Sequence, residues 1–489
     1  MKKKQIWMLC LITALFGSLL LIDRTDAMEL NGLYVMSEEE LTQMVADLPR
    51  ADHLGERLRF EGKPVPYDQS ENTFYVSQKI EEKAYEGTFD AVGEDCMICL
   101  QDDEVLWDKQ EVVSQGHVLR IWFVTKEAYA VANLIFTGLP VIDIDSDEHA
   151  LSEKYARGNI VVQNPNDHDV VTMSAKESQM EAKINDHTGT ISFRLYKKDY
   201  TEERNLSLLG LGKRSAWKLY PVSEKDEAVS REMMAVYLWN CVCEEDTLRK
   251  GMEYAELIVD GEYKGLYYVA PKIGRGYLNL QEEDFLYECE ALQEDGTRQY
   301  KVIGGGNLPS ENSVLKAYED IWKEEGQGFS QIDVENYMNY TIYLQAACAV
   351  QNSVEEYDVA AQQVDGNYRF LKLPERSQFV LGMYPSEIGW QSLFASENII
   401  EDAEYDALSS RIQDLDSRTS KRWGELRKDV LSTDTLLRTA YLYEQRLADS
   451  GYIVRRGEVN AYVMGCNALH DMIEERMEYL DHYYGVVNE

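Results

Sequence analysis

The feature that most constrains the fold is a pair of apolar stretches joined by Asp260-Gly261. Residues 255–259 (AELIV) and 262–269 (EYKGLYYV) are rich in β-branched, aromatic and other apolar side chains. Asp-Gly between two such stretches is a strong signal for a two-residue turn, because both positions of that turn need a positive φ. Any fold of this chain must therefore contain an antiparallel sheet at this point.

The residues around this hairpin mix strands with a single helix. The pattern predicts a strand at 190–196 (TISFRLY) and a helix from Ser230 to Cys243. Upstream, Leu139 to Ile142 forms an apolar strand that we expect to end in an acidic turn, Asp143 to Glu148. Hairpins combined with one helix are typical of an α+β lobe, which we place at about 139–290.

Beyond residue 290 the pattern changes toward helix. Apolar residues recur at helical spacing from Asn336 to Ala349, and nearly all of Glu401 to Tyr484 reads as helix. Two short stretches, Tyr368 to Leu373 and Phe379 to Met383, are strand-like. We expect a helical lobe at about 291–489.

The segment from residue 28 to 138 reads as a separate, small, mostly β domain. A helix is expected from Glu38 to Leu48, followed by strands at 73–76, 91–100 and 118–124. No catalytic grouping stands out in this domain, so a binding or spacing role is expected.

The first 27 residues have the layout of an export signal. Lys2, Lys3 and Lys4 precede an apolar run from Ile6 to Leu21, and a polar stretch ends at Ala27. Cleavage after Ala27 and retention as a membrane anchor are both open. Either outcome predicts an extracellular or cell-surface protein.

The net charge excludes one class of partner. The chain has 87 acidic and 49 basic residues, a formal charge of -38, spread along its length. Such a field repels nucleic acid and anionic lipid surfaces. ATP is also an anion, so a nucleotide site would need a local basic pocket.

Seven cysteines follow Ala27, an odd number that cannot all pair with one another. Cys96 and Cys99 have the spacing of a redox pair or half a zinc site, while Cys241 and Cys243 fall in an apolar helical stretch. Core thiols, one disulfide and a metal site are all compatible with the sequence.

Two blocks of sequence are similar to the spore coat protein H (CotH) kinase-like family. The first contains a Leu-Leu-Gly-Leu turn, a Trp-x-Leu group, and an Asp and an Arg that lead into a helix; the second is the hairpin. The residues that carry the likeness are Leu208-Leu209-Gly210-Leu211, Trp217, Leu219, Asp226, Arg231, Gly261, Tyr263, Gly265, Leu266 and Tyr267. The resemblance covers roughly residues 139–485.

The resemblance implies an atypical protein-kinase-like fold with two lobes. A β-rich N-lobe would hold the nucleotide, and a helical C-lobe would supply acidic metal ligands. ATP with Mg²⁺ or Mn²⁺ would be the cofactor, and secreted or surface proteins would be the substrates.

The fingerprint residues also have structural roles that need no catalysis. Gly261 and Gly265 suit a tight hairpin, and Trp217 with Tyr267 can fill the interior between strands and helix. Arg231 at a helix start needs an acidic partner, for which Asp226 is the nearest candidate.

The carboxylates that the family implies are largely missing. Pro271 stands where the family has a glutamate after the hairpin, and Val354 stands two residues after Asn352, where an aspartate is expected. No Asp-x-Asp follows the next hairpin. Displaced substitutes are Glu355, Glu356 and Asp358, with Glu375 or Glu387 further along.

The cations of the expected N-lobe are better preserved. Lys197, Lys198, Lys213 and Lys218 supply positive charge, and Lys218 and Lys198 are the candidates for contact with a nucleotide. Residues 184–190 (INDHTGT) replace the family's turn before the basic strand, and His187 is expected to be a turn residue.

Three functions remain open. The chain can be an exported pseudokinase that binds or scaffolds other proteins at a cell surface or spore coat. It can be an active atypical kinase, or a purely structural envelope protein. No metal ligand set can be assigned from the sequence.

Overall fold

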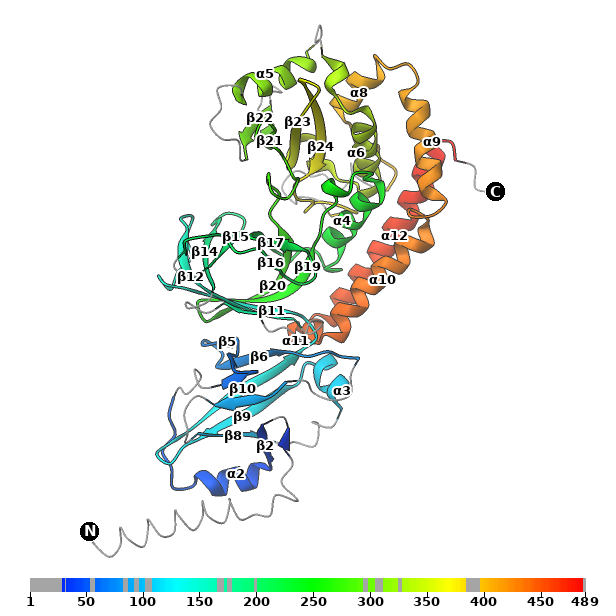
Figure 1. Ribbon diagram of the computed structural model, residues 1–489. Helices are drawn as coiled ribbons and strands as arrows, with labels where there is room; N and C mark the ends of the chain where they lie inside the picture. Colours follow the sequence, from blue (N-terminus) through cyan, green and yellow to red (C-terminus); the bar gives the residue numbers. More distant parts are fainter. Residues whose placement is uncertain are drawn as a thin grey trace, which may run out of the picture.

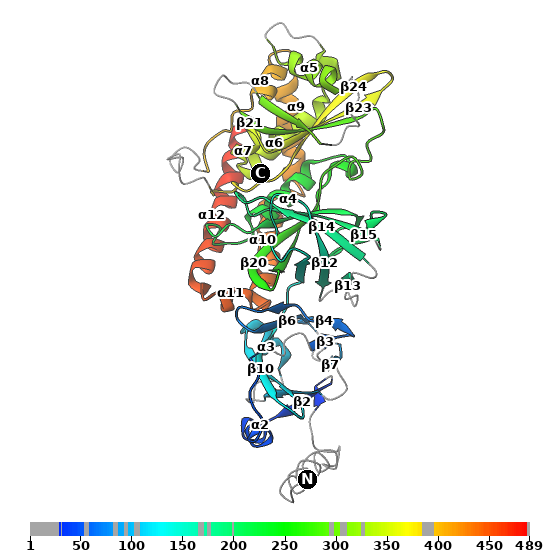
Figure 2. The ribbon, with the colours of Figure 1, turned by 90° about the vertical axis from the view of Figure 1, so that its left-hand side faces the viewer.

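The computed structural model describes residues 29–30, 32–52, 58–81, 87–91, 96–101, 108–164, 171–173, 178–197, 200–292, 298–303, 311–323, 328–383 and 396–486. The expected export signal, Lys198 and Glu387 lie outside these residues. The chain is α+β, and its sheets stack from the N-terminal end to the opposite end of the molecule (Figures 1 and 2).

The N-terminal region is built on a seven-stranded sheet. The strand order is β1 (Glu29–Leu30), β2 (Leu33–Met36), β8 (Met97–Gln101), β9 (Val118–Val124), β10 (Tyr129–Thr137), β6 (Thr73–Ser77) and β5 (Tyr67–Asp68). A smaller sheet contains β4 (Lys63–Pro64), β3 (Leu58–Phe60) and β7 (Phe89–Ala91). Helices α2 (Glu38–Val45) and α3 (Lys109–Ser114) complete the region. The sheet, the strand at 118–124 and the helix that begins at Glu38 agree with the sequence pattern.

The next sheet closes on itself. Its order is β11 (Val141–Ser146), β19 (Glu253–Val259), β20 (Glu262–Pro271), β18 (Ala216–Pro221), β15 (Ile191–Lys197), β14 (Ser178–Ile184) and β12 (Ala156–Gln163), with β13 (Val171–Met173) also on β12. Because β11 pairs with β12 as well as with β19, the seven strands form a barrel. A short ribbon of β16 (Leu206–Ser207) and β17 (Lys213–Arg214) lies outside this ring.

The hairpin expected at Asp260-Gly261 is present. Val259 pairs with Glu262, which leaves Asp260 and Gly261 as the two turn residues, with φ of 51° and 75°. Two positive φ values define the turn type that Asp-Gly favours. A second irregularity lies at Gly265, which pairs with Leu257 and has a φ of 86°. The register of the hairpin shifts there, between Leu257 and Ile258.

The barrel interior is filled by apolar side chains. Trp217 and Tyr267 both belong to its apolar cluster, with Phe193, Leu219 and Val269. They therefore pack between strands, as expected, but helix α4 (Arg231–Val242) belongs to a different core and does not share this interior. Asp226 pairs with the guanidinium of Arg231 at the start of α4, which confirms that expected ion pair.

The C-terminal half contains a second β element that the sequence pattern underestimated. Four strands lie in the order β22 (Arg298–Val302), β21 (Phe285–Leu292), β23 (Tyr357–Val364) and β24 (Asn367–Pro374). The boundary expected near residue 290 falls inside β21, which pairs with β22 and β23 and not with the barrel. This half is therefore a unit of both sheet and helices. The local sequence pattern did not show the sheet, because β21 pairs with β23, a strand that lies far along the chain.

Helices cover this sheet and continue down one side of the molecule. They are α5 (Glu311–Ile321), α6 (Val334–Ala347), α7 (Val350–Val354), α8 (Ala403–Ser409), α9 (Leu415–Arg427), α10 (Thr433–Asp449), α11 (Tyr452–Arg456) and α12 (Val459–Tyr483), with 3₁₀ turns at Asp246–Leu248 and Phe329–Gln331. The long helices α10 and α12 run side by side past the barrel toward the N-terminal sheet (Figures 1 and 2). Among the described helices, none is both long and apolar enough to cross a membrane.

Two further sequence expectations are wrong in detail. Asp143 to Ser146 continues strand β11 and is not a turn, because Asp143 pairs with Val161 on one side and Ile258 on the other. Residues Phe379 to Met383 are not a strand. Val380 and Leu381 are instead buried in the large helical core.

Candidate functional site

A cavity of about 760 Å³ separates the barrel from the four-stranded sheet. One wall comes from β14, β15, β18 and the residues after β20; the other comes from β21, β22, β23 and the residues after β24. Its described lining includes Lys183, Lys218, Lys272, Lys301 and Arg376, and also Glu288, Glu290, Glu356, Asp358 and Glu375. We refer to this cavity as the cleft.

Lys218 reaches the cleft because of strand alternation. Trp217 and Leu219 point into the barrel interior, so Lys218 and Tyr220 between and beside them point outward. The ammonium of Lys218 forms an ion pair with the carboxylate of Glu375, which also accepts a hydrogen bond from the Tyr220 hydroxyl at 3.2 Å. Lys218, which was expected to contact a nucleotide, thus lies in the cleft and is paired with an acid 157 residues away in the chain.

Lys218 and Glu375 each favour the charged form of the other. Burial alone would discharge both groups, yet Lys218 lowers the pKa of Glu375 to about 2, assisted by Lys250 and by the Tyr220 hydroxyl. In turn, Glu375 raises the pKa of Lys218 well above its usual range against the effect of burial. Charge-assisted hydrogen bonds of this kind are the stronger ones in proteins.

Glu375 is placed by its backbone as well as by its side chain. It follows Pro374, the last residue of β24, and its N–H donates to the carbonyl of Glu356 at 2.8 Å. The ammonium of Lys250 binds the Glu375 carbonyl oxygen, and burial lowers the pKa of Lys250 to about 8. This position directly after the β23–β24 hairpin is where the CotH resemblance implies an acidic group.

Of the displaced candidates other than Glu375, both Glu356 and Asp358 line the cleft. Tyr357 and Val359 belong to the helical core, so Asp358 between them points to the opposite face of β23. Glu355 does not line the cleft, and its carboxylate accepts a hydrogen bond from the Gln351 amide at 3.1 Å.

Glu356 enters the cleft through an unusual backbone conformation. Its φ is 53°, a left-handed value that costs energy for a residue with a side chain. Its N–H donates to Cys289 and its carbonyl accepts from the Asn352 amide at 2.7 Å, so the conformation is held from both sides. Burial and the nearby charge of Glu375 raise the pKa of its carboxyl to about 8.

Asn352 serves the architecture of this turn. Its amide nitrogen donates to the carbonyls of Glu356 and Arg376, each at 2.7 Å, and the side chain is buried. It therefore ties the start of β23 to the segment after β24. The side chain of Val354 has no polar atom, and its backbone carbonyl oxygen accepts a hydrogen bond from the Cys289 thiol at 3.6 Å.

Residues 185–190 form a turn at one edge of the cleft. The Asn185 side chain accepts hydrogen bonds from the N–H groups of His187 and Thr188, at 3.0 and 3.1 Å. Thr188 and Thr190 line the cleft, whereas His187 is an exposed turn residue, in agreement with its expected role.

The family fingerprint is separate from the cleft. None of Trp217, Asp226, Arg231, Gly261, Tyr263, Gly265 and Tyr267, all of which are described, lines it. The hairpin tip instead contacts the N-terminal region: the Gln69 N–H donates to the Gly261 carbonyl at 2.8 Å, and Tyr263 stacks on Tyr75. The fingerprint thus marks folding and docking positions.

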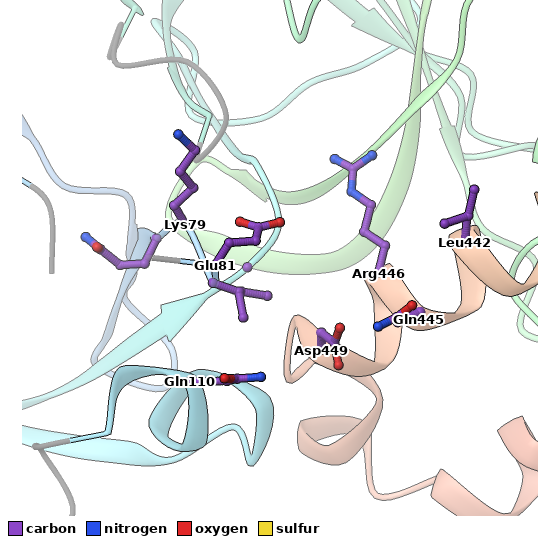
Figure 3. A pocket seen from close by; sticks show the side chains of 10 residues that line it. Lys79, Glu81, Gln110, Leu442, Gln445, Arg446 and Asp449 are labelled. Carbon is purple, nitrogen blue, oxygen red and sulfur yellow. The ribbon is translucent and has the colours of Figure 1, made fainter. Parts of the chain in front are cut away.

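A second cavity, of about 520 Å³, lies where the N-terminal region meets α10. In Figure 3, Glu81 and Gln110 lie on one side of this space, and Gln445 and Asp449 of α10 lie on the other. Its described lining includes none of the buried polar atoms that lack a partner. The chemistry that the sequence predicts is therefore concentrated in the cleft.

Cysteines and metal ligands show no further site. The seven described cysteines form no disulfide with one another. Within the described ranges, no three histidine, cysteine or carboxylate side chains are arranged to hold a metal ion. Glu288, Lys301 and Lys272 were not expected as cleft residues from the sequence. The first two are direct cross-strand partners on β21 and β22, and Lys272 directly follows β20, so only the fold brings them together.

No protein-family model matches the chain, and no curated protein matches it significantly.

Proposed function

We propose that this chain is an exported, CotH-like kinase-fold protein whose cleft binds a nucleotide. In this proposal the barrel is the N-lobe, the four-stranded sheet with its helices is the C-lobe, and the protein acts as a binding or scaffolding component for other secreted or surface proteins. The observation that carries the proposal is the buried pair of Lys218 and Glu375 between the two units.

The charges of the cleft suit an anionic ligand with a cation. The described lining of the cleft has five basic side chains beside six acidic ones, and three of the basic ones, Lys183, Lys218 and Lys272, lie together on the barrel wall, where they supply local positive charge for a phosphate group. Phosphoryl-transfer sites combine a cation that holds phosphates with an acid that positions it. Lys218 and Glu375 fit these two roles.

The apolar part of the lining suits a nucleobase. Ile184, Ile273, Val302 and Ile303 contribute apolar side chains to the same cavity. Small-molecule sites typically combine such walls with a few convergent polar groups. The cleft therefore has both components that a nucleoside phosphate needs.

Catalysis by displaced acids is the second candidate function. It is favoured by one specific observation: Glu288, Glu356, Asp358 and Glu375 all line the cleft, although the family positions at Pro271 and Val354 carry no carboxylate. A missing acid at a metal-phosphate site costs orders of magnitude in rate, because each 1.36 kcal/mol is tenfold. Slow transfer or none is therefore expected.

The first test is thermal unfolding of the full-length chain with ATP plus MgCl₂ or MnCl₂. A ligand at 100 times its Kd adds about 2.7 kcal/mol to stability, which a melting curve detects readily. Lys218→Met should abolish the shift, whereas the exposed Lys213→Met, outside the cleft lining, should retain it. No shift at millimolar ATP in the unaltered chain would overturn the proposal.

Transfer is tested with labelled ATP and Mn²⁺, with and without acceptor proteins. Incorporation at many turnovers per hour, lost in Glu356→Gln or Asp358→Asn and kept in Glu355→Gln, would establish the second candidate. Export is tested separately by N-terminal sequencing of secreted or membrane-extracted protein, which should begin at Met28 or retain an intact anchor.

A further inference from the structure

Exposed apolar side chains are concentrated on the C-terminal helices. Of the eleven large apolar side chains that are exposed in the described residues, seven lie on helices α10, α11 and α12. Single exposed apolar residues are ordinary on a protein surface, but a concentration of them on one face indicates a binding surface. In Figure 2, α12 runs along one edge of the molecule.

The first half of α12 is uncharged on its exposed face. From Val459 to Leu469 the sequence contains no charged residue, in a chain in which 28% of all residues are charged. Val463 and Met464 are 51% and 68% exposed, and Val459 lies one turn before Val463 on the same face of the helix. An apolar surface patch therefore covers about two turns of α12.

This patch continues onto α10. The exposed ring of Tyr441 contacts the ring of His470, with 4.4 Å between the ring centroids. His470 lies seven residues after Val463, which is the same face of α12 two turns further on. We refer to Tyr441, Val459, Val463 and Met464 as the α12 surface.

The opposite face of α12 holds the helix in place, so the α12 surface is not needed for folding. Leu469 belongs to the large core, and the Tyr462 hydroxyl donates to the carbonyl of Glu444 on α10 at 2.7 Å. Gly465 fits so closely against the chain that a Cβ there would lie 2.6 Å from the Ala228 nitrogen. The α12 surface is thus presented outward by a helix that is fixed from behind.

Charge is distributed unevenly along α12. Asp471, Glu474 and Glu478 are exposed beyond the uncharged half. At the other end, the N-cap residue Glu458 does not cap the helix with its side chain, and its carboxylate pairs instead with Arg456 at 2.7 Å. The first turn therefore keeps the positive partial charge of a helix N-terminus. The exposed face has an apolar centre between a positive and a negative end.

We infer that the α12 surface pairs with the same surface of a second copy of the chain, so that the two α12 helices run antiparallel across a two-fold axis near Met464. Such a contact is isologous, because both copies use the same residues. Val459 lies five residues before Met464 and Asp471 seven residues after it. At a rise of 1.5 Å per residue, Asp471 of each copy then lies within about 3 Å, along the axis, of the first turn of the other.

The charge of the whole chain identifies the occupant as a second copy. Two copies of net charge -38 repel each other, so they approach most easily through a surface that lacks charge. In about 0.15 M salt, repulsion between charges further apart than about 8 Å is largely screened. A basic partner would favour a surface with acids at its centre, and the residues from 459 to 469 contain none.

The inference goes beyond the proposed function and does not depend on the nucleotide site. A two-fold pair would present two clefts in one assembly. For a binding or scaffolding protein, two linked sites raise the effective concentration at the second site once the first is occupied.

Sedimentation velocity of the full-length chain tests the inference. We expect a reversible equilibrium of monomer and dimer that shifts toward dimer as NaCl is raised, because salt screens the net repulsion between the copies. The double variant Val463→Glu/Met464→Glu should weaken association by at least about tenfold, since like charges then face each other across the contact. The matched control Val118→Glu, an exposed valine on β9, should associate as the unaltered chain does. Thermal unfolding should show that both variants are folded.

Chemical cross-linking locates the contact on the helix. A short bismaleimide should join Met464→Cys into a covalent dimer, because the two-fold axis brings its two new thiols together, whereas Val118→Cys should remain uncoupled. A chain that stays monomeric at high micromolar concentration, or a dimer that the double variant retains, would overturn the inference. A dimer that NaCl dissociates would overturn it as well, because opposite charges would then hold the copies together. A monomeric chain that binds an amphipathic helical peptide of Leu and Lys, and loses that binding in the double variant, would assign the α12 surface to a basic partner instead.

Discussion

The two walls of the cleft differ in charge. The barrel wall contributes Lys183, Lys218 and Lys272 against one acid, Glu153. The wall on the side of the four-stranded sheet contributes Glu288, Glu290, Glu356, Asp358 and Glu375 against Lys301 and Arg376. Three of the five cations of the described lining thus come from a closed barrel with an apolar core, and five of its six acids come from the adjacent sheet and the residues next to its strands.

This difference suggests a division of roles between the walls. A ligand that carries both an anionic group and a cation can satisfy both at once, and a neutral ligand can satisfy neither. The Lys218–Glu375 pair is the contact at which the two walls already neutralise each other. Mutations on each wall should therefore have separable effects on folding and on binding.

The largest effect is expected from the core that supports the cationic wall. Trp217 is fully buried in the barrel, directly before Lys218. Trp217→Ala should cost about 3–5 kcal/mol in unfolding free energy, as large-to-small core changes do. Denaturant unfolding measures the cost, with the exposed Tyr155→Ala as the control. A loss below 1 kcal/mol would mean that the barrel is not a cooperative support for this wall.

The next effect tests the contact between the walls. Lys218→Met leaves Glu375 with its charge largely buried and unpaired, which should cost about 3 kcal/mol. The double variant Lys218→Met/Glu375→Gln should recover most of that loss, because both charges are then absent. Urea unfolding of the two single variants and the double variant gives the coupling energy. Additive losses would show that the pair does not join the walls.

The acidic wall should respond to pH through Glu356. Its carboxyl has a folded-state pKa of about 8, above the ordinary 4.5. A raised folded-state pKa stabilises the protein below about pH 4.5, and that stability is lost as pH rises toward 8. Glu356→Gln should remove up to about 1.4 kcal/mol per pH unit of this decline.

Unfolding free energies at intervals between pH 5 and 8 provide the measurement. The difference between the unaltered chain and Glu356→Gln should grow steadily across this window. A difference that is constant with pH would show that Glu356 is already ionised in the folded cleft.

Local patterns in the sequence were sufficient for much of the scaffold. The Asp260-Gly261 turn, the strand at 118–124 and the helix that starts after Ser230 depend on neighbours in the chain. The Asp226–Arg231 pair spans only five residues and was also predictable. The barrel closure was not, because β11 pairs with β19 more than 100 residues later.

The cleft was only partly predictable for the same reason. Lys218 was a candidate because of its place in the family pattern, but its partner Glu375 is known only from the fold. In a chain with 87 acidic residues, composition cannot show which carboxylates converge. The alternation of β23 separates Asp358 from Tyr357, yet the sequence alone does not show which face meets the cleft.

The smallest effect is expected at Glu355, the neighbour of Glu356. The two acids are adjacent in sequence, but the positive φ of Glu356 turns its side chain into the cleft, while Glu355 hydrogen-bonds to Gln351 outside it. Glu355→Gln should therefore change the unfolding free energy by no more than about 0.5 kcal/mol, as for other surface substitutions. ATP and Mn²⁺ responses and the pH dependence of stability should match those of the unaltered chain. If Glu355→Gln instead reproduced the pH effect expected of Glu356→Gln, the acidic wall would be formed by the other residue of the pair, and the strained turn at Glu356 would have no role in the cleft.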